Sequence, residues 1–168
     1  EKLIIQSRGN RSNVTEAISL SVVRSAMDLG AKAIITPTES GYTARMVAKY
    51  RPAVPVIAVT TKEEVVRRLS LVYGVFPFLG KEAANTDELF DHAIALAENK
   101  GFVQPGDLVV ITAGVPVGRS GSTNLIKIHQ IGRVIARGQG VGSQSATGKV
   151  VLARTAEEAL AKTREGDI

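Results

Sequence analysis

The fold is decided by the stretch Lys32-Ala33-Ile34-Ile35-Thr36-Pro37-Thr38-Glu39-Ser40-Gly41, in the first third of this 168-residue chain. Its first five residues are mostly apolar or β-branched, which predicts a strand buried on both faces. Residues 37–41 are mainly turn formers, and Tyr42–Tyr50 has the pattern of a helix that ends before Arg51-Pro52. A buried strand followed at once by a helix is the repeating unit of a parallel, helix-covered sheet.

The same alternation continues on both sides of this stretch. Apolar runs predict further strands at residues 55–60, 75–79, 108–112 and 124–131. Apolar stripes predict helices at residues 14–29, 62–71 and 86–100. We therefore expect an α/β fold: a five-stranded, mostly parallel sheet covered by helices on both faces, with a small Gly-rich C-terminal extension. Right-handed crossovers would place the loops that follow the strands along one edge, where such sheets bind ligands.

Characteristic residues mark the ends of these helices. Side chains of Asn or Thr suit the starts, often with Glu three residues later, and Gly suits the left-handed residue after the end. The expected caps are Asn13 with Glu16, Thr61 with Glu64, and Asn85 or Thr86, and the expected left-handed residues are Gly30 and Gly101.

The chain divides into three parts by composition. Residues 1–13 are polar and are interpreted as a connector, residues 14–131 as the sheet domain, and residues 132–168 as an extension that holds six of the 16 glycines. Within the extension we expect a strand at 149–153 and a helix at 155–164. Because the chain begins with Glu1 and closes on a sequence like the one that opens the strand at 108, we expect a fragment of a longer protein.

Composition excludes several function classes. The chain has no Cys and only two His, so thiolate sites, disulfide scaffolds and His-rich metal sites are excluded. Its net charge of +5 is spread without basic runs, and its aromatics are only four Phe and three Tyr, so nucleic acid is not expected as a partner. No apolar run has the length of a membrane span, so no membrane partner is expected either.

The first candidate site lies between the strand at 32–36 and the helix that follows. It offers hydroxyls at Thr38, Ser40 and Thr43, and Gly41 lets the backbone come close to a ligand. Together with the free N–H groups of a helix start, these residues indicate an anion pocket, most naturally for phosphate. The alternative is that the hydroxyls only cap the helix.

The second candidate site is the Gly-rich segment 112–124. It differs from a nucleotide-binding phosphate loop, because Ala113 stands where the first Gly is needed, Arg119 replaces the Lys, and a strand follows instead of a helix. A loop that brings Arg119 beside the anion pocket explains the segment better, since guanidinium forms charge-assisted bonds with phosphate. The sequence shows no acid–base pair, nucleophile–base pair or metal cluster that would support catalysis.

Several segments together resemble the C-terminal domain of pyruvate kinase, in the same order and from about Val14 to Ile131. The resemblance implies a regulatory and oligomerisation domain of an enzyme that transfers phosphoryl from phosphoenolpyruvate to ADP. It implies no catalytic residue in this chain, which would be inactive alone. The segments that carry it are 15–18, 36–45, 49–52, 57–60, 74–75, 106–109 and 112–124.

The resemblance also implies partners and cofactors outside the chain. Mg²⁺, K⁺ and the substrates would bind in an upstream barrel domain, with no cofactor in this fragment, and the parent would be a cytoplasmic tetramer. Residues 132–168 resemble the start of the extra C-terminal region of some bacterial pyruvate kinases, which is similar to a swivelling domain. The phosphohistidine site of such domains does not occur in this stretch.

The family's effector pocket is carried over residue by residue. Its expected members, all implied to bind a phosphorylated effector, are Thr38, Glu39, Ser40, Gly41, Tyr42, Thr43, Arg119, Gly121, Ser122 and Thr123. Relatives activated by fructose 1,6-bisphosphate tend to have Lys at the position of Glu39, so a carboxylate there predicts a monophosphate effector such as ribose 5-phosphate, glucose 6-phosphate or AMP. Two alternatives are a structural subunit-interface domain with a vestigial pocket and a small independent enzyme.

Overall fold

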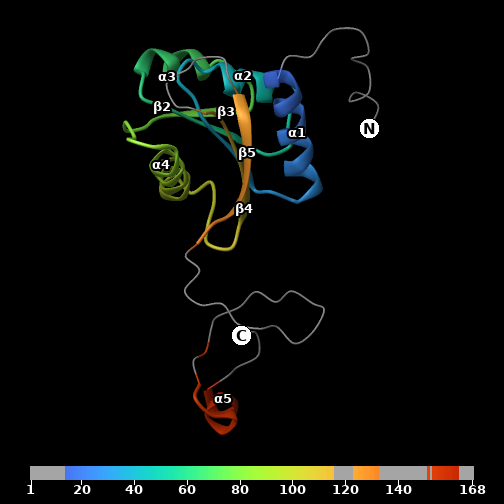
Figure 1. Ribbon diagram of the computed structural model, residues 1–168, viewed down its shortest axis with the longest axis vertical. Coiled ribbons are helices and arrows are strands. Elements are labelled where there is room, and N and C mark those ends of the chain that lie inside the picture. The colour runs from blue at the N-terminus through green and yellow to red at the C-terminus, as the bar shows by residue number, and fades with distance from the viewer. Residues whose placement is uncertain (1–13, 116–122, 133–150, 152, 163–168) are drawn as a thin grey trace. The chain divides into compact units, whose positions relative to one another are not determined.

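The computed structural model describes residues 14–115, 123–132, 151 and 153–162 (Figure 1). The chain divides into two compact units, Glu1–Gly132 and Arg133–Ile168. In the first unit helices and strands alternate along the chain, except that the last two elements are both strands. They are α1 (Val14–Asp28), β1 (Ala33–Pro37), α2 (Tyr42–Ala48), β2 (Val56–Thr60), α3 (Glu63–Leu69), β3 (Val75–Leu79), α4 (Thr86–Asn99), β4 (Leu108–Gly114) and β5 (Thr123–Gln130).

The five strands form one sheet in the order β3-β2-β1-β4-β5. The first four are parallel, and β5 runs antiparallel to β4. The predicted five-stranded, mostly parallel α/β fold is therefore confirmed. β1 is the central strand, and all five of its residues are buried, as the continuous apolar run predicted.

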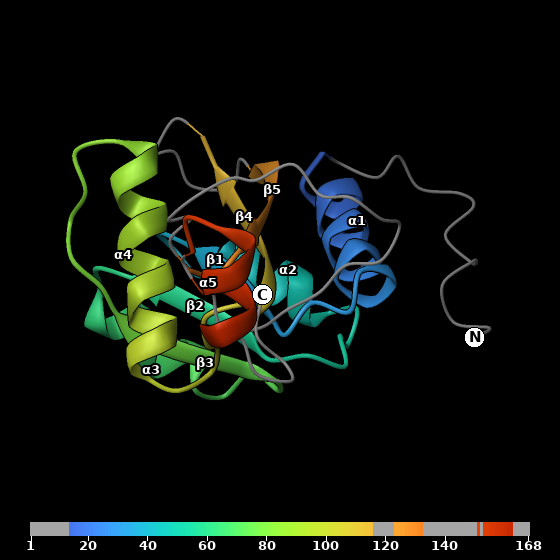
Figure 2. The same cartoon turned by 90° about the horizontal axis from the view of Figure 1, so that it is seen from below.

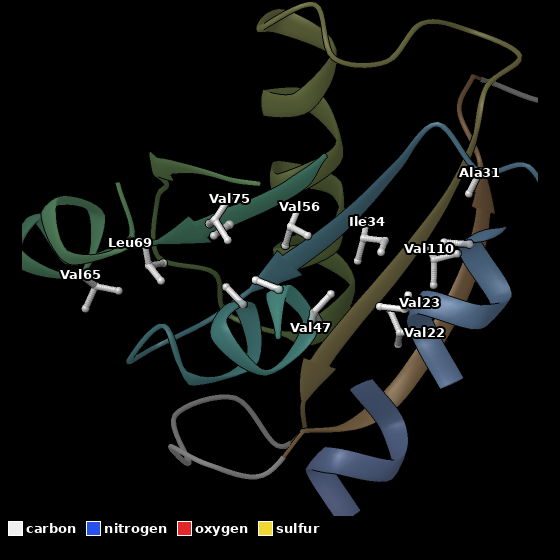
Figure 3. Packing of buried hydrophobic residues seen from close by; sticks show 14 residues of the cluster. Val22, Val23, Ala31, Ile34, Val47, Val56, Val65, Leu69, Val75 and Val110 are labelled. Carbon is white, nitrogen blue, oxygen red and sulfur yellow. The ribbon is translucent and has the colours of Figure 1, made fainter. Parts of the chain in front are cut away.

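Helices cover both faces of the sheet, as expected. Alternate residues of β1 point to opposite sides: Ile34 belongs to the core that includes residues of α1, α2 and α3, whereas Ala33 and Ile35 belong to the core that includes residues of α4. Figure 3 shows the first of these two cores, where Val22 and Val23 of α1 lie beside the sheet. Figure 2 shows α4 and α1 on opposite sides of the strands.

Most predicted helix ends agree with the structure. Gly30 and Gly101 both have positive φ, 63° and 73°, as expected for residues that end helices. The side chain of Asn85 caps α4 by accepting a hydrogen bond from the Glu88 N–H at 2.9 Å. The carboxylate of Glu88 in turn accepts from the N–H of Ala84 at 2.8 Å, which ties the preceding chain to the helix start.

The prediction of a capping box at Thr61 and Glu64 is wrong. α3 begins at Glu63, and its N-cap is Lys62, whose side chain does not cap the helix. The N–H of Lys62 donates to the hydroxyl of Thr60 at 3.4 Å, and the helix begins one residue later than predicted. The predicted cap at Asn13 lies outside the described residues.

Asn85→Ala is expected to lower the free energy of unfolding by about 1 kcal/mol, because the Glu88 N–H loses its acceptor. Urea unfolding followed by far-UV circular dichroism measures this loss. Asn85→Asp is the matched control, since it keeps a side-chain oxygen at the cap and adds a charge that the helix start favours. Equal losses in the two variants would contradict a capping role.

The second unit is described over a short segment. α5 spans Ala156–Lys162, within the predicted helix at 155–164. The predicted cap at Thr155 is present, because the Glu158 N–H donates to the Thr155 hydroxyl at 3.2 Å. The Glu158 carboxylate accepts at 2.9 Å from the N–H of Arg154, the residue before the cap. The predicted strand at 149–153 is not supported where it is described, because Val151 and Ala153 are not in a strand. Its other residues lie outside the described part.

No helix in the described segments combines the length and the apolar character that crossing a membrane requires.

Candidate functional site: the carboxyl edge of the sheet

The loops that follow β1 and β2 and the end of β4 lie at the edge of the sheet where the parallel strands end, here called the carboxyl edge. The register places Pro37, the last residue of β1, opposite Val59 of β2. The N–H of Thr38 donates to the carbonyl of Val59 at 2.8 Å, so the first residue of the loop is still attached to the sheet. A rigid strand end therefore positions the predicted site.

Residues 38–41 form a tight turn, here called the 38–41 turn. The hydroxyl of Thr38 accepts a hydrogen bond from the N–H of Gly41 at 3.0 Å, which closes the turn. This hydroxyl still has its own proton to donate to an anion. Gly41 is the N-cap of α2 and has no side chain with which to cap it, so the Thr38 hydroxyl closes the turn before the helix.

Gly41 is required at its position for two reasons. Its φ of 77° is left-handed, which disfavours other residues. A Cβ atom at Gly41 would lie only 3.1 Å from Cδ2 of Leu69 and 3.2 Å from Cγ1 of Val65, both on α3. The 38–41 turn thus packs directly on the neighbouring helix.

Thr43 and Thr123 bring the two predicted halves of the site together. Their hydroxyl oxygens lie 2.8 Å apart, although the residues are 80 positions apart in the sequence. Both side chains are buried. Only one of the two hydroxyl protons is used in the bond between them, so the other is available for a second acceptor. Thr43 belongs to the first turn of α2, and Thr123 opens β5.

The base of the Gly-rich segment is closed by Asn124. Its side chain accepts from the Val115 N–H at 2.9 Å and donates to the Val115 carbonyl at 2.7 Å. The β4–β5 register shifts at this place, between Ala113 and Gly114. The amide of Asn124 therefore joins Val115 to the start of β5, on the two sides of segment 116–122.

One contact at the carboxyl edge was not predicted from the sequence. The ammonium of Lys62, which follows β2, lies 2.5 Å from the carboxylate of Glu39 in the 38–41 turn. The hydrogen bond and the charge of Glu39 raise the pKa of Lys62, so Lys62 is a cation at neutral pH. The order of two parallel strands could have indicated this contact, because residues that follow neighbouring strands reach the same edge.

The structure describes only some of the remaining predicted site residues. Ser40 and Tyr42 are half-buried beside Gly41. Arg119, Gly121 and Ser122 lie outside the described residues. In the structure Thr43 thus contacts Thr123, and Glu39 contacts Lys62, which was not predicted to belong to the site.

The fold and the site together define an α/β domain with hydroxyls and an ion pair along the carboxyl edge of its sheet. Within the described residues, no three or more His, Asp or Glu side chains are grouped so as to hold a metal ion. A family model described as pyruvate kinase, alpha/beta domain, matches residues 16–129. The chain belongs to the pyruvate kinase family, and it corresponds to the C-terminal α/β domain.

Relatives and a solved structure agree with this assignment. The chain is 55% identical over 157 residues to a pyruvate kinase of Lactobacillus delbrueckii subsp. bulgaricus, covering 94% of this chain and 27% of the relative. It is 52% identical over 163 residues to a pyruvate kinase of Geobacillus stearothermophilus, covering 97% and 28%. The crystal structure of Cryptosporidium parvum pyruvate kinase superposes with a TM-score of 0.63 at 36% identity, over 72% of this chain and 23% of that one. The chain thus spans about a quarter of the length of these proteins.

Proposed function

We propose that this chain is the regulatory and oligomerisation part of a pyruvate kinase, and that its carboxyl edge binds a phosphorylated effector. The observation that carries the proposal is the bond between Thr43 and Thr123. It joins the first turn of α2, directly after the 38–41 turn, to the start of β5 at the end of the Gly-rich segment, and these two sequence segments were expected to form one anion pocket. The proposed pocket also includes Arg119, Gly121 and Ser122 from that segment.

Hydroxyl donors supply the chemistry of the proposed pocket. The Thr38 hydroxyl and one hydroxyl of the Thr43–Thr123 pair each have a proton to offer to a phosphate oxygen. Arg119 would add a guanidinium, whose bonds to phosphate are roughly twice as strong as neutral hydrogen bonds. One phosphate group would accept hydrogen bonds from all of these donors, and the negative charge of Glu39 would repel a second phosphate. We therefore propose a monophosphate such as ribose 5-phosphate, glucose 6-phosphate or AMP.

The proposed parent enzyme transfers phosphoryl from phosphoenolpyruvate to ADP, giving pyruvate and ATP, in the cytoplasm. We propose that Mg²⁺ and K⁺ bind in an upstream barrel domain, as the resemblance to pyruvate kinase implies. Residues 132–168 are proposed as the start of an extra region similar to a swivelling domain. The effector would act on the barrel through a difference in its affinity for two states of a tetramer.

Calorimetric titration of the 168-residue chain tests the effector proposal. We expect at least one of ribose 5-phosphate, glucose 6-phosphate and AMP to bind more tightly than fructose 1,6-bisphosphate. In the complete enzyme, Arg119→Ala is expected to weaken activation by that monophosphate without lowering the maximal rate of the fully activated enzyme.

Two results would count against this function. Tighter binding of the bisphosphate than of every monophosphate would overturn the choice of effector. A lowered maximal rate with normal activation in Arg119→Ala would remove Arg119 from the effector pocket.

A second candidate function is a structural domain that pairs subunits and has a vestigial pocket. The same Thr43–Thr123 pair favours it in one respect, because the two buried hydroxyls already satisfy each other in part without a ligand. This alternative predicts that no phosphorylated metabolite stabilises the chain in a thermal-shift screen.

A further inference from the structure

The short helix α2 connects the proposed effector site to the start of α1. Its N-cap is Gly41 of the 38–41 turn, and its first turn contains Thr43. Its C-cap is Lys49, whose side chain contacts Glu16 in the first turn of α1. A displacement of α2 along its axis therefore acts on the 38–41 turn at one end and on α1 at the other.

The contact between Lys49 and Glu16 is a charged hydrogen bond that joins two helices. The Lys49 ammonium lies 2.5 Å from Oε1 of Glu16. This hydrogen bond and the charge of Glu16 raise the pKa of Lys49, so Lys49 is a cation at neutral pH. Whereas the pairs Arg24–Asp28 and Arg67–Glu63 each lie within a single helix, this pair makes the relative position of α1 and α2 depend on one contact.

Mostly small side chains hold α2 in its place. Its buried residues are Thr43, Ala44, Val47 and Ala48. Val47 belongs to the same core as Val22 of α1 (Figure 3). A helix that rests on small side chains interlocks little with its neighbours, so it can move as a unit by a small sliding shift.

We propose that the Lys49–Glu16 pair transmits effector binding from α2 to α1; this rests on the proposed function. A phosphate that accepts hydrogen bonds from the hydroxyls of the carboxyl edge pulls on the first turn of α2. The shift of α2 passes through Lys49 to Glu16 and so to the start of α1. Residues 1–13, the proposed connector to the barrel, directly precede that start. Lys49 and Glu16 are thus positioning residues, at the end of α2 opposite to the effector.

The test separates effector binding from effector activation. Lys49→Met keeps the aliphatic stem without the charge, and Glu16→Gln keeps the length of the side chain. The matched control is Lys162→Met in α5, because Lys162 also lies 2.5 Å from a Glu carboxylate and its side chain is similarly exposed, 52% against 56% for Lys49.

The same four variants, the three single ones and Glu16→Gln/Lys49→Met, are made in the 168-residue chain and in the complete enzyme. The chain is titrated calorimetrically with ribose 5-phosphate, glucose 6-phosphate and AMP. The enzyme is assayed with and without each compound, which gives the activation ratio: the factor by which the compound lowers the half-saturating concentration of phosphoenolpyruvate.

We expect Lys49→Met and Glu16→Gln each to reduce the activation ratio about 2- to 5-fold, the factor in an equilibrium constant that one exposed ion pair supplies. The affinity of the 168-residue chain for the monophosphate is expected to stay unchanged, because the hydroxyls of the pocket are untouched. The double variant is expected to lose no more than either single variant, since both substitutions remove the same contact. Lys162→Met is expected to change neither quantity.

Each other outcome counts against a proposal. The transmission proposal is overturned, and the effector function stands, if a monophosphate activates Lys49→Met as fully as the unaltered enzyme, if the losses of the single variants add in the double variant, or if Lys162→Met loses as much activation. Weaker monophosphate binding to the Lys49→Met chain would place Lys49 in the binding site and would also overturn transmission. If none of the three compounds binds the unaltered chain or activates the unaltered enzyme, both proposals are overturned.

Discussion

Gly41→Ala is expected to lower the free energy of unfolding by about 2–5 kcal/mol. Two costs add: a left-handed backbone costs a residue with a Cβ about 1–2 kcal/mol, and forcing a methyl group into a packed contact costs about 1–3 kcal/mol. The contact is with Leu69 and Val65, whose methyl groups would lie within 3.2 Å of the new Cβ. Urea unfolding followed by circular dichroism at 222 nm measures the loss.

Gly74→Ala is the matched control for this prediction. Its φ of 73° is close to the 77° of Gly41, but a Cβ there would meet no atom within 4 Å. Gly74→Ala is therefore expected to show the backbone cost alone, about 1–2 kcal/mol. Equal losses at the two positions would mean that the 38–41 turn does not depend on close packing against α3.

Thr123→Val is expected to lower the free energy of unfolding by about 1–3 kcal/mol, because the buried hydroxyl of Thr43 loses its partner. Valine has nearly the shape of threonine, so packing is preserved and the loss reports on the hydrogen bond. The same urea titration measures it.

The double variant Thr43→Val/Thr123→Val sharpens this prediction. Replacing both partners by apolar groups of the same shape is close to neutral, so the double variant is expected to regain most of the stability lost in Thr123→Val. If the pair also serves the effector pocket, the double variant folds normally but binds monophosphates more weakly. If the losses of stability from the two substitutions simply add in the double variant, the two hydroxyls do not stabilise each other.

The five strands of the sheet were predicted to within one residue at each end, except that β4 ends two residues later than predicted. This accuracy has a physical cause, since strands covered by helices on both faces need continuous apolar runs, and such runs are short and sharply bounded. β1 and β2 are buried along their whole length. β5 alternates more, because it lies at the edge of the sheet, yet its apolar positions were enough to place it.

Helix starts were predicted to within one residue, but the capping residue of α3 was predicted wrongly. Thr61 and Glu64 have the spacing of a capping box, but the structure starts the helix after Lys62. Spacing describes only the local chain, whereas Lys62 is also held by contacts with Thr60 and with Glu39 from another loop. α4 and α5 follow their capping residues because the contacts that define those starts are local.

The amino-acid sequence by itself determined the α/β class, the alternation of its elements and the family resemblance, and it led to the carboxyl edge as the place of the proposed site, because each depends on residues that are near one another in the chain. Only the tertiary structure decided which of these residues meet. The Thr43–Thr123 bond spans 80 positions, and the Glu39–Lys62 pair joins loops after two different strands. Both contacts depend on the order of the strands in the sheet and on the packing of α2 and α3, which no local pattern specifies.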